Sequence, residues 1–101
     1  STREIPSFGG FTMLLLEDEA IRGAVVINRT GMGGYIPENI LVYIATDKNK
    51  RGRGWGKSLL KSALDRAEGD IALHVDADNM ARQLYENFGF TTPYLEMRLK
   101  R

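Results

Sequence analysis

Apolar residues recur along the chain with two different periods, and the change of period predicts which segments form strands and which form helices. Two apolar runs, residues 11–16 and 21–27, flank an acidic turn at residues 17–19 and predict a β-hairpin. Residues 40–46 are apolar at successive positions and rich in β-branched side chains. This composition is typical of a strand that is buried on both faces.

A helical period begins at Trp55. One stripe predicts an amphipathic helix that ends near Gly69 and carries Trp55, Leu59, Leu60, Ala63, Leu64 and Ala67. Residues 71–75 alternate again, which predicts a strand, and a second helix is expected over residues 79–88. Residues 95–99 alternate between apolar and charged side chains, which predicts a last strand with one solvent-exposed face. The expected fold is therefore a single α/β (α+β) domain over residues 1–101, with a mixed sheet and the order β-β-β-α-β-α-β. Residues 1–10 are expected to be a polar lead-in.

Composition narrows the chemistry. The formal net charge is +1, so no global field attracts the chain to nucleic acid or to an anionic membrane, and we expect neither partner. The chain has no cysteine, which excludes thiolate metal sites and a cysteine nucleophile and fits a cytoplasmic setting. A single histidine, His74, argues against a histidine-based zinc site, and we expect no metal.

The segment KRGRGWGKSLL, residues 50–60, joins a predicted buried strand to a predicted helix. It is not a Walker A loop, because Arg51 stands where that motif needs its first glycine. It is not the dinucleotide fingerprint either, since Lys57 occupies the place of the third glycine.

Three interpretations of this loop remain. Its basic residues suit a nucleic-acid patch, although Trp55 falls on the apolar stripe of the helix rather than among them. It is also compatible with a solvated turn into a helix. The third interpretation is a pyrophosphate cradle, because glycines at a helix start let an anion approach unpaired backbone N–H groups. The cradle explains the three alternating glycines, Gly52, Gly54 and Gly56.

Two motifs give the chain a resemblance to the GNAT superfamily of acyl-CoA N-acyltransferases. The family loop Gln/Arg-x-x-Gly-x-Gly/Ala stands here as Arg51 to Gly56. A second family signature, a strand and helix ending in Leu-Tyr-x-x-x-Gly-Phe, stands here in LHVDADNMARQLYENFGF, with Leu84-Tyr85 and Gly89-Phe90. The resemblance covers the chain from about Phe11 onward.

The resemblance implies that acetyl-CoA or another acyl-CoA is the cofactor and that an amine accepts the acyl group by direct attack. Central strands in the family splay apart around CoA. Tyr85 matches the tyrosine that protonates the departing thiolate. The spacing before Tyr85 is one residue shorter than usual, so the family asparagine corresponds to Asn79 when counted along the strand and to Asp78 when counted back from Tyr85, and we prefer Asn79. The implied cofactor-binding residues are Ile44, Ala45, Thr46, Arg51, Gly52, Arg53, Gly54, Trp55, Gly56, Lys57, Asn79 and Tyr85.

The attacking amine needs a general base. His74 stands where members that act on ribosomal-protein N-termini carry a glutamate, and histidine titrates near neutral pH. Glu38, just before the predicted buried strand, is the second candidate. Family members begin with a strand and two helices that wall the acceptor site, whereas only residues 1–10 precede the hairpin here. The acceptor side is therefore expected to be open, or completed by a partner chain such as a homodimer or by a further segment. The competing interpretation is a non-catalytic CoA-binding module.

Overall fold

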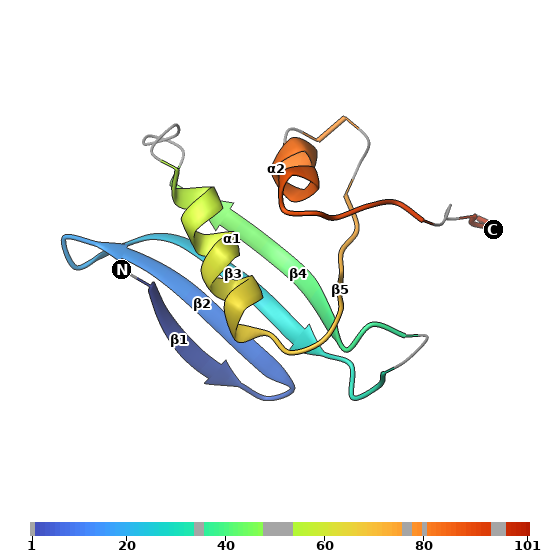
Figure 1. The fold of residues 1–101 in the computed structure, drawn as a ribbon, viewed down its shortest axis with the longest axis horizontal. Helices are drawn as coiled ribbons and strands as arrows, with labels where there is room; N and C mark the ends of the chain where they lie inside the picture. Colours follow the sequence, from blue (N-terminus) through green and yellow to red (C-terminus); the bar gives the residue numbers. More distant parts are fainter. Residues whose placement is uncertain (1, 34–35, 48–53, 76–77, 80, 94–96) are drawn as a thin grey trace.

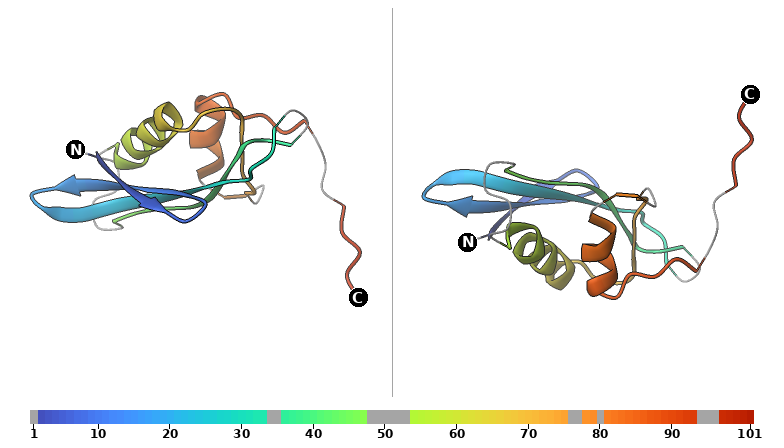
Figure 2. Two further views of the ribbon diagram at one scale, coloured as in Figure 1. Left: turned by 90° about the horizontal axis from the view of Figure 1, so that it is seen from below. Right: turned by 90° about the horizontal axis from the view of Figure 1, so that it is seen from above.

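Five strands form one sheet in the order β1-β2-β3-β4-β5, with both helices on one face of it (Figures 1 and 2). The structure is a computed structural model, and it describes residues 2–33, 36–47, 54–75, 78–79, 81–93 and 97–101. Strands β1 to β4 pair antiparallel, and β4 pairs parallel with β5. The predicted mixed α/β class is confirmed. The elements are β1 (Thr2–Ser7), β2 (Gly10–Glu17), β3 (Ala20–Arg29), β4 (Asn39–Thr46), α1 (Trp55–Arg66), β5 (Ile71–Ala72) and α2 (Ala81–Asn87).

The core lies between α1 and the sheet. The predicted helical stripe is confirmed, because Trp55, Leu59, Leu60 and Ala63 are all buried. They meet apolar side chains from alternate positions of β2, β3 and β4, namely Phe11, Met13, Leu15, Val25, Ile27 and Leu41. Fully burying one such large side chain stabilises a fold by about 1.5–3 kcal/mol. The opposite side of α1 is exposed to solvent and carries the Lys61–Asp65 ion pair.

Residues 1–10 were expected to be a polar lead-in, and residues 2–7 of this segment form a regular strand. They form β1, an edge strand that pairs with β2 from Thr2↔Leu15 to Ser7↔Gly10. Pro6 suggested a loop. An edge strand tolerates proline because the backbone N–H groups on its outer side make no hydrogen bonds to a neighbouring strand. β1 is also tied to α1, since the Glu4 carboxylate pairs with the Arg66 guanidinium.

The prediction that residues 40–46 are buried on both faces is also wrong. Side chains of Val42 and Tyr43 are 54% and 57% exposed, because both helices cover the other face of the sheet (Figure 2). The apolar run therefore indicates a strand with one face packed on α1 and one face left open.

The C-terminal part of the chain departs most from the prediction. The last strand expected over residues 95–99 is not formed in the described residues 97–101, and Met97 is 92% exposed. A strand there would need an edge to pair with, and β5 offers a ladder of only two residues. In the described ranges, no helix is both long enough and apolar enough to cross a membrane.

Candidate functional site

Strands β4 and β5 part soon after they meet. Their ladder holds only Asn39↔Ile71 and Ile40↔Ala72, while β4 continues to Thr46 (Figure 1). On its other side, β4 stays paired with β3, where Ile44, Ala45 and Thr46 oppose Val25, Ala24 and Gly23. Within the described residues, no strand pairs with the second edge of this segment. The predicted splay is therefore present, and it leaves backbone N–H and C=O groups available to an extended ligand.

A β-bulge lies where the strands separate. The β3–β4 register changes from Ile27↔Leu41 to Val26↔Tyr43, so Val42 is the extra residue that has no partner on β3. Bulges re-aim backbone and side chains and are frequent beside functional sites. The sequence contains no signal for this bulge. Leu41, Val42 and Tyr43 are all apolar or aromatic, so no change in the alternation of polar and apolar residues marks the extra residue.

The first turn of α1 lies past the end of β4. Gly54 caps the helix with φ +73° and ψ +16°, a left-handed conformation that favours glycine. No side chain caps this turn, and the Gly54 carbonyl already accepts the Ser58 N–H at 3.0 Å. The N–H groups of Trp55, Gly56 and Lys57 come before the first intrahelical bond, so they carry the positive end of the helix dipole. Arg51, Gly52 and Arg53 lie outside the described residues.

Helix α2 stands next to this first turn. A Cβ placed on Gly56 would lie 3.5 Å from Leu84 Cδ2, so the glycine allows α1 and α2 to approach closely. Tyr85 follows Leu84 and is buried, with its ring 5.8 Å from that of Phe90 in an edge-to-face arrangement. Burial raises the pKa of the Tyr85 phenol, so its proton is retained through neutral pH.

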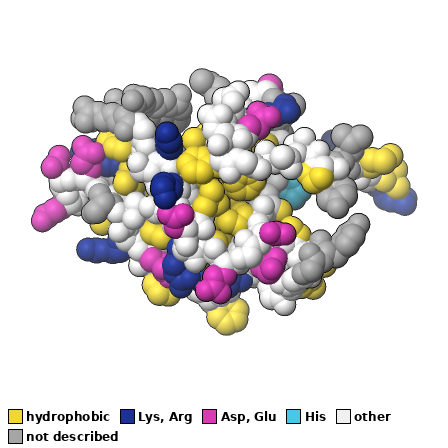
Figure 3. All heavy atoms as spheres, viewed as in Figure 1, with side chains coloured by type: hydrophobic (Ala, Val, Ile, Leu, Met, Phe, Trp, Pro, Cys, Tyr) yellow, Lys and Arg dark blue, Asp and Glu magenta, His cyan; other side chains and the backbone are white. Residues whose placement is uncertain are grey.

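Apolar side chains line the space between the two helices. In Figure 3 they gather in the middle of this face, between α1 and α2 and over β4. Half-buried side chains that pack around the core here include Ile44, Leu73, Val75, Leu84 and Phe88. An apolar lining with a few polar groups at one end is typical of a cofactor site.

Trp55 packs in the core, as its place on the helical stripe predicted. Its indole Nε1 donates to Glu17 Oε2 at 3.0 Å, and the Arg22 guanidinium lies 5.9 Å from the ring. Arg22 in turn pairs with Asp47 at 3.2 Å. These contacts fasten the β2–β3 turn and the end of β4 to the first turn of α1. Only the backbone of Trp55 is thus free to contact a ligand at that turn.

His74 and Asn79 follow β5 along the chain. Ile71, Leu73 and Val75 pack against the core, as their alternation predicted, and the His74 side chain is exposed. The side-chain oxygen of Asn79 accepts the Ala81 N–H at 2.8 Å, and its carbonyl accepts the Arg82 N–H. Asn79 therefore caps α2, which positions the helix that carries Tyr85.

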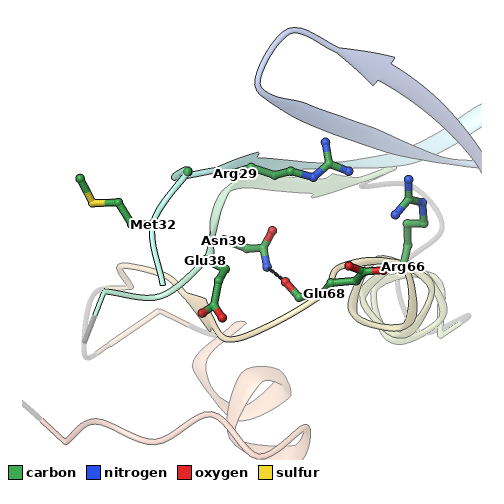
Figure 4. Close-up of a pocket in the computed structure, with 7 residues that line it drawn as sticks. Arg29, Met32, Glu38, Asn39, Arg66 and Glu68 are labelled. Carbon is green, nitrogen blue, oxygen red and sulfur yellow. Dashed lines mark hydrogen bonds between the residues drawn. The ribbon is translucent and has the colours of Figure 1, made fainter. Parts of the chain in front are cut away.

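Glu38 lies at the other end of β4, away from Gly54. Its carboxylate accepts the backbone N–H of Asp70 at 3.3 Å. It lines a pocket of about 310 Å³ together with Arg29, Gly31, Met32, Asn39, Arg66 and Glu68. In Figure 4 the two arginine side chains reach toward each other, and the Glu38 carboxylate is turned away from both. This placement separates Glu38 from the glycine turn by the length of β4, about 25 Å.

The structure thus brings together the end of β4, the first turn of α1 and Tyr85, and it leaves Glu38 apart. Sequence reasoning missed Asn39, the one polar side chain among the described residues that is buried, at 2% exposure. It also missed the carboxylate and guanidinium that hold Trp55. A buried polar residue at the start of an apolar strand is a signal that could have identified Asn39.

The chain matches one family of known proteins. The family model of the acetyltransferase (GNAT) domain matches residues 9–92 of the chain. The family match spans the hairpin, the glycine turn and α2, so it includes every described element except β1. No curated protein sequence matches the chain.

Solved structures share the fold. A protein from Pyrococcus furiosus, assigned as an acetyl transferase, is 28% identical with a TM-score of 0.73, and the alignment covers 90% of this chain and 65% of that one. A ribosomal-protein-alanine N-acetyltransferase from Brucella melitensis is 18% identical with a TM-score of 0.72, covering 93% and 72%. An aminoglycoside N-acetyltransferase in complex with CoA is 14% identical with a TM-score of 0.72, covering 94% and 68%. The chain therefore spans about two thirds of the length of these structures.

Proposed function

The chain belongs to the GNAT acetyltransferase family, and we propose that it transfers an acetyl or other acyl group from acyl-CoA to an amine. The observation that carries this proposal is the edge of β4 beyond Ile40, which pairs with no strand among the described residues and leads toward the first turn of α1. An extended arm and a pyrophosphate are the two chemical parts that such an edge and such a turn bind.

The described residues fit acyl-CoA in two places. The backbone of Ile44, Ala45 and Thr46 offers strand-like hydrogen bonds to the pantetheine arm. The N–H groups of Trp55, Gly56 and Lys57 offer donors to the pyrophosphate, and we assign Arg51, Gly52 and Arg53 to the same role from the family motif. When bound, acyl-CoA supplies the acyl group as an activated thioester, and acetyl-CoA is the form that we propose.

Tyr85 is the proposed general acid. Tyr85 lies on α2 next to Leu84, whose side chain would be 3.5 Å from a Cβ placed on Gly56 in the first turn of α1. Burial raises the pKa of the Tyr85 phenol, so the phenol is protonated at neutral pH. A protonated phenol held in a partly apolar cleft is suited to donate to a leaving thiolate.

His74 is the proposed general base. Its exposed imidazole follows the two-residue β4–β5 ladder, on the segment that diverges from β4. An acceptor amine is protonated at neutral pH and must lose a proton before it attacks, so a water-accessible imidazole is a suitable acceptor. Glu38 is the weaker candidate, because its carboxylate already accepts the Asp70 N–H at the far end of β4.

A non-catalytic CoA-binding module is the second candidate function. The exposed side chains of Val42 and Tyr43 favour the binding module. They show that, among the described residues, nothing covers one side of the β4 segment that we assign to the pantetheine arm. Such a module binds acyl-CoA with the same residues and releases no free CoA thiol in the presence of any amine.

Calorimetric titration of the chain with acetyl-CoA tests the proposal, with ATP and a short DNA duplex as controls. Micromolar binding of acetyl-CoA alone supports the cofactor site. No binding of acetyl-CoA contradicts it, and binding of DNA favours the basic-patch interpretation instead. An amine screen that follows release of the CoA thiol then separates the enzyme from the binding module.

A further inference from the structure

A side chain from the β2–β3 hairpin holds the first turn of α1. Trp55, the first residue of α1, is 7% exposed, and its indole Nε1 donates to Glu17 Oε2 at 3.0 Å. A buried indole N–H needs a partner, and a hydrogen bond to a carboxylate is shorter and stronger than one to a neutral oxygen. Because few rotatable bonds join the ring to the main chain, a fixed indole also fixes the backbone of Trp55.

Two further charged residues complete this attachment, and we call Glu17, Arg22 and Asp47 the indole clamp. The Arg22 guanidinium lies 5.9 Å from the Trp55 ring and pairs with the Asp47 carboxylate at 3.2 Å. The Asp47 N–H also donates to the Arg22 carbonyl at 2.8 Å, so both backbone and side chains join these two residues. In Figure 1 the β2–β3 turn, the end of β4 and the start of α1 lie at the same end of the sheet. The clamp therefore joins β2, β3 and the end of β4 to one helical turn.

The hairpin turn that supplies Glu17 adopts a conformation that its residues disfavour. Glu17 pairs with Ala20, and the residues between them, Asp18 and Glu19, have φ of +54° and +63°. Glycine and asparagine suit such a turn, whereas glutamate rarely has a positive φ. Residues in disfavoured conformations persist where the surrounding structure determines them, and they cluster at functional sites. The short turn fixes the end of β2, so it also fixes the place from which the Glu17 carboxylate reaches the indole.

We propose that Glu17 is a positioning residue for the pyrophosphate of acyl-CoA, an inference that rests on the proposed function. Through Trp55, Glu17 holds the N–H groups of residues 55–57 in one arrangement before the ligand binds, and a site that is ordered in advance binds more tightly. The charge of Glu17 opposes this role, since a carboxylate repels an anion, so the hydrogen bond to the indole must carry it. The pantetheine arm is assigned to the backbone of residues 44–46. Glu17 should therefore affect only the part of the ligand that carries phosphate.

Two ligands separate this positioning role from a general structural role. Acetyl-CoA carries the pyrophosphate, whereas S-acetylpantetheine carries the same acyl arm without any phosphate. NMR titration of the isotope-labelled full chain measures micromolar and millimolar affinities alike, and the amide signals of residues 55–57 report contact with the turn. A residue that only stabilises the fold would change the affinities for both ligands equally.

In Glu17→Ala the indole loses its acceptor. We expect the Kd for acetyl-CoA to rise about tenfold, which is the typical contribution of a hydrogen bond to a charged group. The Kd for S-acetylpantetheine should stay within about twofold, because its assigned contacts lie away from the turn. Glu17→Gln keeps an oxygen that accepts the indole N–H and has one negative charge fewer, so it should bind acetyl-CoA at least as tightly as the wild type. The matched control is Glu19→Ala, which removes the same charge from an exposed position of the same turn and should not weaken binding.

Trp55→Phe tests the same hydrogen bond from the helix side. The ring stays in the core and its N–H is removed, so the acetyl-CoA Kd should again rise about tenfold. Glu17→Ala/Trp55→Phe should lose no more affinity than either single variant, because both changes remove one interaction. Trp55→Phe also keeps the inference testable if Glu17→Ala does not fold.

Three results overturn the inference: unchanged acetyl-CoA affinity in Glu17→Ala or in Trp55→Phe, equal losses for the two ligands, and additive losses in the double variant. Weaker binding in Glu17→Gln or Glu19→Ala would assign the effect to charge and overturn it as well. A wild-type chain that does not bind acetyl-CoA contradicts the proposed function itself. That outcome is distinguishable from a wild-type chain that binds acetyl-CoA while the Glu17→Ala affinity is unchanged, which contradicts the positioning role alone.

Discussion

The side-chain amide of Asn39 donates a hydrogen bond to the backbone carbonyl of Glu68 at 2.6 Å and lies 3.3 Å from the carbonyl of Asp70. Asn39 is the first residue of β4, and Glu68 follows the end of α1. One buried amide thus joins the start of one central strand to the segment that leads into the next. The bond fixes the point from which β4 and β5 diverge, and so it sets the opening of the proposed cofactor cleft.

Replacing this amide should destabilise the fold. In Asn39→Ala the Glu68 carbonyl loses its donor, while the Asp70 carbonyl keeps the backbone N–H of residue 39 at 3.0 Å. The expected loss in the free energy of unfolding is about 1–3 kcal/mol. Urea denaturation followed by circular dichroism measures it. The control is Asn28→Ala, at an exposed position of β3, with an expected change within about 0.5 kcal/mol. Equal effects of the two variants would show that the Asn39 amide contributes no special stability.

The left-handed conformation of Gly54 allows a paired test of the glycine turn. Gly54 and Gly9 both have positive φ, +73° and +78°, and open space where a Cβ would stand. Alanine at either position should lower the free energy of unfolding by about 1–2 kcal/mol. Only Gly54→Ala should also weaken acetyl-CoA binding, by more than tenfold in calorimetry. Equal affinities for the two variants would mean that the turn only connects β4 to α1.

The proposed acid role of Tyr85 predicts a split between catalysis and binding. Tyr85→Phe should lower kcat by about 10²-fold, because general acid catalysis typically contributes that much, and leave the acetyl-CoA Kd within a factor of two. Tyr43→Phe, which removes an exposed hydroxyl, is the control and should match the wild type. A parallel loss of kcat and of CoA affinity in Tyr85→Phe would indicate that the phenol binds rather than reacts.

Burial of Tyr85 also predicts how stability depends on pH. The pKa of its phenol is raised in the folded chain and returns to its ordinary value, about 10, on unfolding. Stability from the buried neutral phenol is complete below that value and is lost as the pH rises above it through the higher pKa of the folded chain. Wild type should therefore lose stability between pH 9 and 11 more steeply than Tyr85→Phe in urea denaturation. Identical slopes would contradict the burial of a neutral phenol.

The two candidate bases are distinguished by kinetics. His74→Ala should lower kcat by about 10²–10⁴-fold, since general base catalysis typically contributes that much. Glu38→Gln should keep kcat within a factor of three, because an amide oxygen still accepts the Asp70 N–H. The reverse result, with Glu38→Gln inactive and His74→Ala active, would exchange the two roles.

Much of this fold follows from local pattern. The stripe from Trp55 to Ala63 and the alternation in β2 and β3 predict their elements because each element buries one face against α1 or the sheet. The pattern in residues 40–46 misleads, since it reports apolar side chains and says nothing about whether a second layer covers them. Pro6 concealed β1, because a strand accepts proline only where it lies at the edge of a sheet. Whether a strand lies at the edge depends on the tertiary fold and not on its local sequence.

The candidate site divides in the same way. The glycine spacing and the Leu84-Tyr85 pair identify the α1 turn and α2, since a motif carries its own local conformation. The Val42 bulge, the Asn39 amide and the contacts of Trp55 with Glu17 and Arg22 join residues far apart in the chain. No local pattern encodes which residues meet across such distances. The sequence therefore predicts which segments form the candidate site and does not reveal the contacts that hold these segments in place.

The placement of Trp55 gives the protein a built-in optical probe. It is the single tryptophan in the chain, and its indole occupies the first turn of α1, hydrogen-bonded to a carboxylate and close to a guanidinium. Indole emission responds strongly to charges near the ring. The tryptophan emission of the molecule therefore originates at the proposed pyrophosphate end of the site, so an event there is visible without any attached dye.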